Sequence, residues 1–65
     1  MTENTFRTRL EAEKTELDVK IESLEIFMKS EDFRLGMSTE QRDQLVIQLA
    51  IMESYSAILK IRLKK

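Results

Sequence analysis

The chain contains no cysteine, histidine, proline or tryptophan, and it has a single glycine, Gly36. Without Cys and His, disulfide frameworks, Cys/His zinc sites and thiol catalysis are excluded. The lack of Cys is compatible with a reducing cytoplasm, where we expect the protein to act. Its longest uninterrupted apolar run, residues 49–52, is far shorter than the about 20 residues of a transmembrane helix. Residues 1–10 lack the apolar core of a secretory signal. We therefore expect no membrane partner.

The 65 residues are 35% charged and 42% hydrophobic, a composition typical of long helices or coiled coils. The length allows one structural unit. The net charge of −1 argues against binding nucleic acid through overall charge. We predict an all-α protein, a single helical hairpin covering residues 1–65.

The predicted hairpin has a first helix from about 3 to 29, a loop from about 30 to 37 and a second helix from about 39 to 64. Ser38 and Gln41 match a capping box, which marks the start of the second helix. Gly36 is the loop residue suited to a left-handed turn, and Phe33, Leu35 and Met37 are expected to plug the end of the hairpin. Two nearly equal helices joined by a short loop favour an antiparallel, coiled-coil-like pair. The first helix offers one apolar row at seven- and four-residue steps: Leu10, Leu17, Ile21, Leu24 and Met28.

The second helix carries two apolar stripes. The leucine stripe, interrupted by Ser56, consists of Leu45, Leu49, Met52, Leu59 and Leu63. The isoleucine stripe, interrupted by Ser54, consists of Ile47, Ile51, Ile58 and Ile61. At 100° per residue the stripes lie roughly 200° apart, and one hairpin can bury only one of them. We predict that the chain forms a homo-oligomer or binds another protein, with both stripes as candidate interfaces.

The sequence offers little support for an enzyme. Neighbouring acidic residues such as Glu11 and Glu13 would need to be buried together to act as an acid–base or metal site, whereas a solvated helix face explains them without chemistry. No phosphate-binding glycine loop or Glu-x-x-His motif is present. We expect no catalytic residues, no metal and no cofactor.

A ligand site is suggested by the second helix between its two stripes. Tyr55 offers a ring for base stacking, Arg62 a guanidinium for phosphate, and Gln48 an amide for a base edge. Arg7 and Lys60 would add positive charge, because an antiparallel hairpin brings both chain ends together. The alternatives are that Tyr55 is an interface aromatic and that the cations complement the helix dipole.

The order of residues resembles a family of phage proteins. It begins with Phe6, Arg9-Leu10, Glu13-Lys14, Glu16-Leu17, Lys20 to Glu25, Phe27 and Ser30 to Phe33. It continues with Glu40-Gln41, Leu45, Gln48-Leu49, Met52, Tyr55, Ile58-Leu59 and Arg62. This pattern, which spans nearly the whole chain, resembles the small helical-hairpin accessory proteins of crAss-like and other tailed bacteriophages. The resemblance implies a small protein that acts in the infected bacterium, where such proteins often inhibit host defences by binding.

Three functional hypotheses remain open. The first is an oligomer that sequesters an anionic cyclic nucleotide signal, by analogy with unrelated small helical phage proteins. The second is an inhibitor or adaptor that docks an exposed apolar stripe on a host protein. The third is a DNA-binding accessory protein, which only the basic end supports and the acidic first helix opposes.

Overall fold

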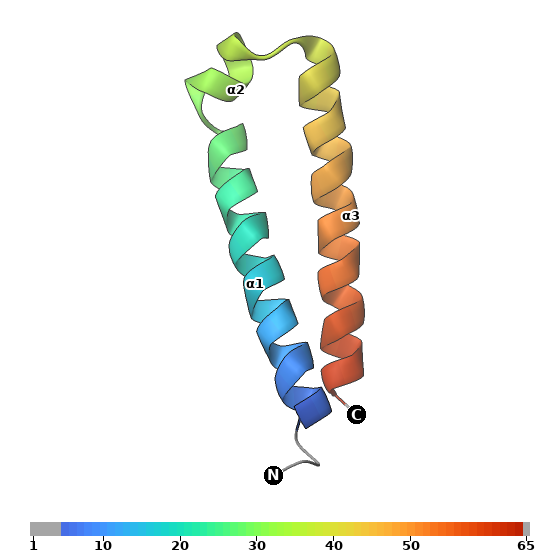
Figure 1. Cartoon of the computed structure of the whole chain (residues 1–65). Helices are drawn as coiled ribbons and strands as arrows, with labels where there is room; N and C mark the ends of the chain where they lie inside the picture. Colours follow the sequence, from blue (N-terminus) through green and yellow to red (C-terminus); the bar gives the residue numbers. More distant parts are fainter. Residues whose placement is uncertain (1–4, 65) are drawn as a thin grey trace.

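The computed structural model describes residues 5–64, which form an antiparallel helical hairpin. Helix α1 spans Thr5–Met28, the short helix α2 spans Glu31–Gly36, and helix α3 spans Thr39–Leu63. Figure 1 shows α1 and α3 side by side, with α2 at the turn and the start of α1 near the end of α3 at the opposite pole. No strand occurs between residues 5 and 64. The predicted all-α hairpin is confirmed, while the expected helical start at Glu3 lies outside the described residues.

The leucine stripe of α3 packs against the apolar row of α1. Leu59 is fully buried and Leu10 is 6% exposed, whereas the other leucines of both rows are half-buried. The structure therefore places Leu45, Leu49, Met52, Leu59 and Leu63 in the seam within the hairpin. The isoleucine stripe points away from α1 and stays uncovered in one hairpin.

Most of the segment predicted as a loop is helical. Ser30 caps α2, because its hydroxyl accepts a hydrogen bond from the Phe33 backbone N–H at 3.2 Å. The Phe33 ring meets the Phe27 ring edge-on at 6.0 Å. Gly36 ends α2 without a positive φ angle, so the expected left-handed turn is absent at this residue. Leu35 is 73% exposed and does not plug the hairpin end, although Phe33 and Met37 are half-buried.

The predicted capping box is confirmed at the start of α3. The Gln41 backbone N–H donates to the Ser38 hydroxyl at 3.1 Å, and the Ser38 backbone N–H donates to the Gln41 side chain at 3.0 Å. Arg42 then links α3 to α2 by donating to the Arg34 carbonyl at 2.5 Å. These bonds set where α3 begins, and with it the pairing of residues across the hairpin.

The hairpin is a thin rod of 50 × 15 × 13 Å. Its radius of gyration is 15.2 Å, whereas a compact domain of this length would have about 11 Å. Among residues 5–64 only Leu10 and Leu59 are buried, and six large apolar or aromatic side chains of α3 are exposed. A single copy thus leaves much of its apolar surface in water.

Candidate functional site

The isoleucine stripe is an uncovered apolar surface of α3. Its four members are between 51% and 64% exposed, and Val46 beside them is 52% exposed. By length and composition α3 would also be long and apolar enough to cross a membrane. A search for uninterrupted apolar runs does not detect this property, because polar residues separate the apolar residues along the sequence. The two stripes together nevertheless make α3 apolar on both sides. Core helices of soluble proteins pass the same test.

Tyr55 lies at the edge between the two stripes and is 42% exposed. Its hydroxyl donates a hydrogen bond across the hairpin to the Glu13 carboxylate on α1. The bond orients the phenol toward α1 while part of the ring remains in solvent. A ring held in this way is suited to stacking against a planar ligand.

Arg62 lies two helical turns beyond Tyr55 on the same edge of α3. Its guanidinium carbon sits 5.7 Å from the centre of the Phe6 ring, within the range of a cation–π interaction. On the other side of Tyr55, the Gln48 amide contacts the Met52 sulfur at 3.8 Å. The steps of seven residues from Gln48 to Tyr55 and Arg62 keep the three side chains on one edge, as predicted.

Arg7 and Lys60 lie on the opposite edge of the hairpin. Lys60 precedes Arg62 by two residues, which turns it about 200° around the helix. Arg7 follows Phe6 and pairs with Glu11 at 3.7 Å, both side chains being more than half exposed. The predicted set of five ligand residues is therefore split within one chain: three share the Tyr55 edge and two do not. Lys65, counted in the basic end from the sequence, lies outside the described residues.

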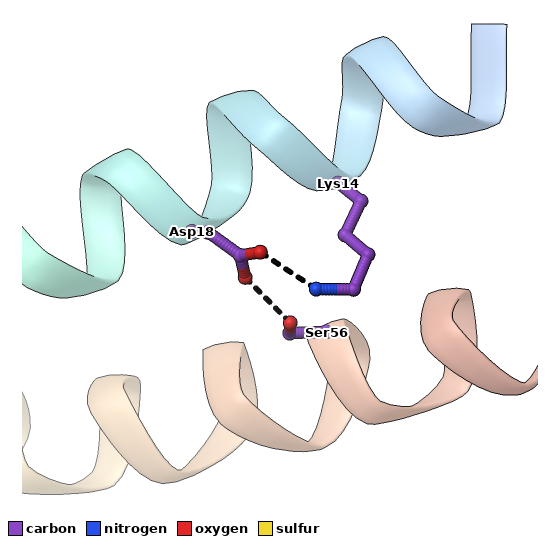
Figure 2. A network of polar contacts seen from close by, with 3 residues as sticks. All are labelled: Lys14, Asp18 and Ser56. Atoms are coloured by element: carbon purple, nitrogen blue, oxygen red, sulfur yellow. Dashed lines mark hydrogen bonds and ion pairs between the residues drawn. The ribbon is translucent and has the colours of Figure 1, made fainter. Parts of the chain in front are cut away.

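The opposite edge also holds a polar network that the sequence reasoning missed (Figure 2). The Asp18 carboxylate accepts hydrogen bonds from the Lys14 ammonium and from the Ser56 hydroxyl of α3, each at 2.6 Å. These bonds, led by the one from Lys14, hold the pKa of Asp18 below its usual range. The four-residue spacing of Lys14 and Asp18 beside the apolar row of α1 could have indicated the ion pair between them. Ser56 therefore joins α3 to α1 by a hydrogen bond, in addition to filling a gap in the leucine stripe.

The described residues do not enclose a ligand at Tyr55. One open hollow lies along one side of α1 and is lined by Thr15, Glu16, Val19 and Lys20. No group of three or more acidic side chains between residues 5 and 64 is placed to hold a metal ion. What one chain provides is an open polar edge beside an uncovered apolar stripe.

Comparison with known proteins identifies the family. The Sequestin family model matches residues 4–65, nearly the entire chain. No curated protein and no solved structure matches it. The family points to a protein that binds a molecule, in agreement with the sequence-based expectation of a binding protein over an enzyme. The chain belongs to the Sequestin family.

Proposed function

We propose that this protein is a non-enzymatic accessory protein of phage type that oligomerises and sequesters an anionic cyclic nucleotide signal. Its site of action is the cytoplasm of an infected bacterium, where removal of the signal would counter host defence. The observation that carries the proposal is the half-exposed ring of Tyr55 on one edge with Arg62, in a chain of the Sequestin family. The family name fits the holding of a signal molecule.

The Tyr55 edge supplies the contacts that a nucleotide needs. The exposed part of the Tyr55 ring can stack on a base, since every base has an aromatic face. The Arg62 guanidinium, which rests on Phe6, can form two parallel hydrogen bonds to a phosphate. The Gln48 amide can both donate to and accept from a base edge.

Oligomerisation is part of the proposal because one chain leaves this edge open. A neighbouring copy would wall the edge and exclude water, which strengthens charge–phosphate contacts. It would also contribute polar groups of its own to the edge, which one chain lines with Gln48, Tyr55 and Arg62. Sequestration then needs tight binding and slow release, with no turnover.

The test is thermal melting of the pure protein with a panel of cyclic di- and trinucleotides. A ligand at 100 times its Kd should stabilise the folded state by about 2.7 kcal/mol per site. Linear nucleotides of the same bases serve as controls for nonspecific anion binding. No shift with any cyclic nucleotide would contradict the proposal.

A second candidate function is supported by the exposed isoleucine stripe: an inhibitor or adaptor that docks this stripe in a groove of a host protein. Affinity capture from bacterial lysate with wild type and Ile51→Glu as baits separates the two functions. A host protein held by wild type and lost with Ile51→Glu would favour the adaptor. Recovery of the bait alone would count against it.

A further inference from the structure

The isoleucine stripe has the spacing of a coiled-coil seam. With Ser54 included, its members follow each other at steps of four, three, four and three residues from Ile47 to Ile61. Residues that repeat every 3.5 positions form a narrow apolar stripe, whereas an ordinary surface helix has a broad apolar face. Such a narrow stripe favours pairing with another helix. Because α1 already covers the leucine stripe, that other helix must come from outside the hairpin.

Small residues make the stripe accessible to a close neighbour. Ala50, Ser54 and Ala57 are exposed and lie within or beside the stripe. No long side chain at these positions keeps a second backbone away. The surface is thus shaped for a helix at short distance.

We propose that α3 pairs in antiparallel orientation with α3 of a second copy through the isoleucine stripe. The charges that flank the stripe select this orientation. Asp43 lies beside the stripe in the first part of α3 and Lys64 beside it at the end, and both are exposed. Antiparallel pairing brings Asp43 and Lys64 of the two copies together and opposes the two helix dipoles, whereas parallel pairing would place Asp43 beside the neutral Gln48 of the partner subunit.

One register satisfies both the seam and the charges. It places Ile47 opposite Ile58 of the partner subunit, and Ile51 opposite Ser54 of the partner subunit. Asp43 then lies beside Lys64 of the partner subunit. Ile61 then faces Gln44 of the partner subunit. Shifting by one heptad toward the N-termini would instead set Ile58 opposite Glu40 of the partner subunit and move the position opposite Ile61 outside α3.

The same register completes the Tyr55 edge. Steps of seven residues put Gln41, Gln48, Tyr55 and Arg62 on the same flank of the stripe. In the antiparallel pair these flanks face each other, and Tyr55 lies beside Gln48 of the partner subunit. Arg62 likewise lies beside Gln41 of the partner subunit. The two-fold axis creates two such edges per dimer. In this respect the inference rests on the proposed function, since it states how a second copy contributes to the nucleotide site.

A second copy covers the stripe better than a lipid bilayer would. An apolar span over α3 would carry Glu53 near its centre, where a charged side chain is costly in hydrocarbon. In the paired arrangement Glu53, which is exposed in the hairpin, remains outside the seam and in water.

The first experiment compares two substitutions at isoleucines of equal exposure. Ile51 on α3 and Ile26 on α1 are each 64% exposed. Sedimentation equilibrium should show that wild type and Ile26→Glu dimerise, while Ile51→Glu raises the dimer dissociation constant about 100-fold or more. Circular dichroism at high protein concentration checks that all three chains are helical. A helical wild type that stays monomeric at every concentration, a pair of variants that dissociate equally, or wild type that inserts into neutral phosphatidylcholine vesicles would overturn the proposal.

The second experiment tests the relative orientation of the two α3 helices. Because the chain has no native Cys, each variant carries a single thiol. Asp43→Cys and Lys64→Cys chains are mixed and treated with a short thiol cross-linker. Antiparallel pairing should link the two variants to each other and not to themselves, since equal positions lie about 30 Å apart along the axis. Efficient self-linking of Asp43→Cys would show parallel pairing and overturn the proposal.

Failure of the two proposals can be told apart because neither experiment contains a ligand. An antiparallel dimer that no cyclic nucleotide stabilises would remove the proposed function and leave the pairing. Nucleotide binding by a chain whose Asp43→Cys and Lys64→Cys variants do not link to each other would remove the pairing and leave the function.

Discussion

The hydroxyl of Tyr55 on α3 donates a hydrogen bond to the carboxylate of Glu13 on α1. The contact joins the two long helices along one edge and gives the phenol group a partner within the chain. It leaves the ring partly exposed, so the hydroxyl and the ring have separable roles. The hydroxyl belongs to the hairpin, and the ring is available to a ligand.

Substitutions at Tyr55 should separate these two roles. Tyr55→Phe removes the hydrogen bond and is expected to lower the free energy of unfolding by no more than about 1.5 kcal/mol. It should leave nucleotide affinity nearly unchanged, because the ring persists. Tyr55→Leu removes the ring and should weaken binding by about 1–3 kcal/mol. Calorimetric titration with the nucleotide that gives the largest melting shift measures both. Equal losses of affinity in the two variants would assign binding to the hydroxyl.

The hairpin core should depend on Leu59 far more than on other leucines. Leu59 is fully buried and Leu35 is 73% exposed. Leu59→Ala is expected to lower the free energy of unfolding by about 2–5 kcal/mol, because it removes packed atoms and leaves a cavity. The matched Leu35→Ala change should stay within about 0.5 kcal/mol. Urea unfolding at one fixed protein concentration compares them, and similar midpoints would show that the seam is not the core.

The sequence predicts the parts of the fold that local rules determine. The apolar row of α1 and the leucine stripe of α3 follow helical spacing, and Ser38 with Gln41 carries its own capping signal. The helix α2 was also signalled, since Ser30 precedes the acidic pair Glu31 and Asp32. We predict a loop here because Gly36 suggests a turn, whereas the structure places Gly36 as the last residue of α2.

The site could be predicted only along one helix. Gln48, Tyr55 and Arg62 share an edge because seven residues are close to two helical turns. Their partners on α1 depend on how the helices are rotated and aligned, which α2 and the cap of α3 help to set. For this reason sequence reasoning found neither Glu13 beside Tyr55 nor Phe6 under Arg62. It also grouped Arg7 and Lys60 with residues of the opposite edge.

The capping box of α3 should contribute measurably to stability. Ser38→Ala removes the acceptor for the Gln41 backbone N–H and is expected to lower the free energy of unfolding by about 0.5–2 kcal/mol. Ser38→Gly should cost only a few tenths of a kcal/mol, since glycine lets water reach the free N–H groups. Urea unfolding followed by circular dichroism provides the comparison. A larger loss for glycine than for alanine would indicate that backbone restriction at Ser38 matters more than its hydroxyl.

The Asp18 network should make part of the stability depend on pH in the acidic range. Bonds from Lys14 and Ser56 lower the pKa of Asp18 in the folded chain, whereas the unfolded chain has the ordinary aspartate value of about 3.9. The stabilisation is therefore fully present above about pH 4 and is lost as the pH falls through the lowered, folded-state pKa. Asp18→Asn should reduce stability at neutral pH and flatten its decline in acid. Ser56→Ala, which removes one of the two bonds, should fall between Asp18→Asn and wild type. Unfolding in urea from pH 7 to pH 2 tests the series, and parallel pH profiles for wild type and Asp18→Asn would show that the network does not stabilise the hairpin.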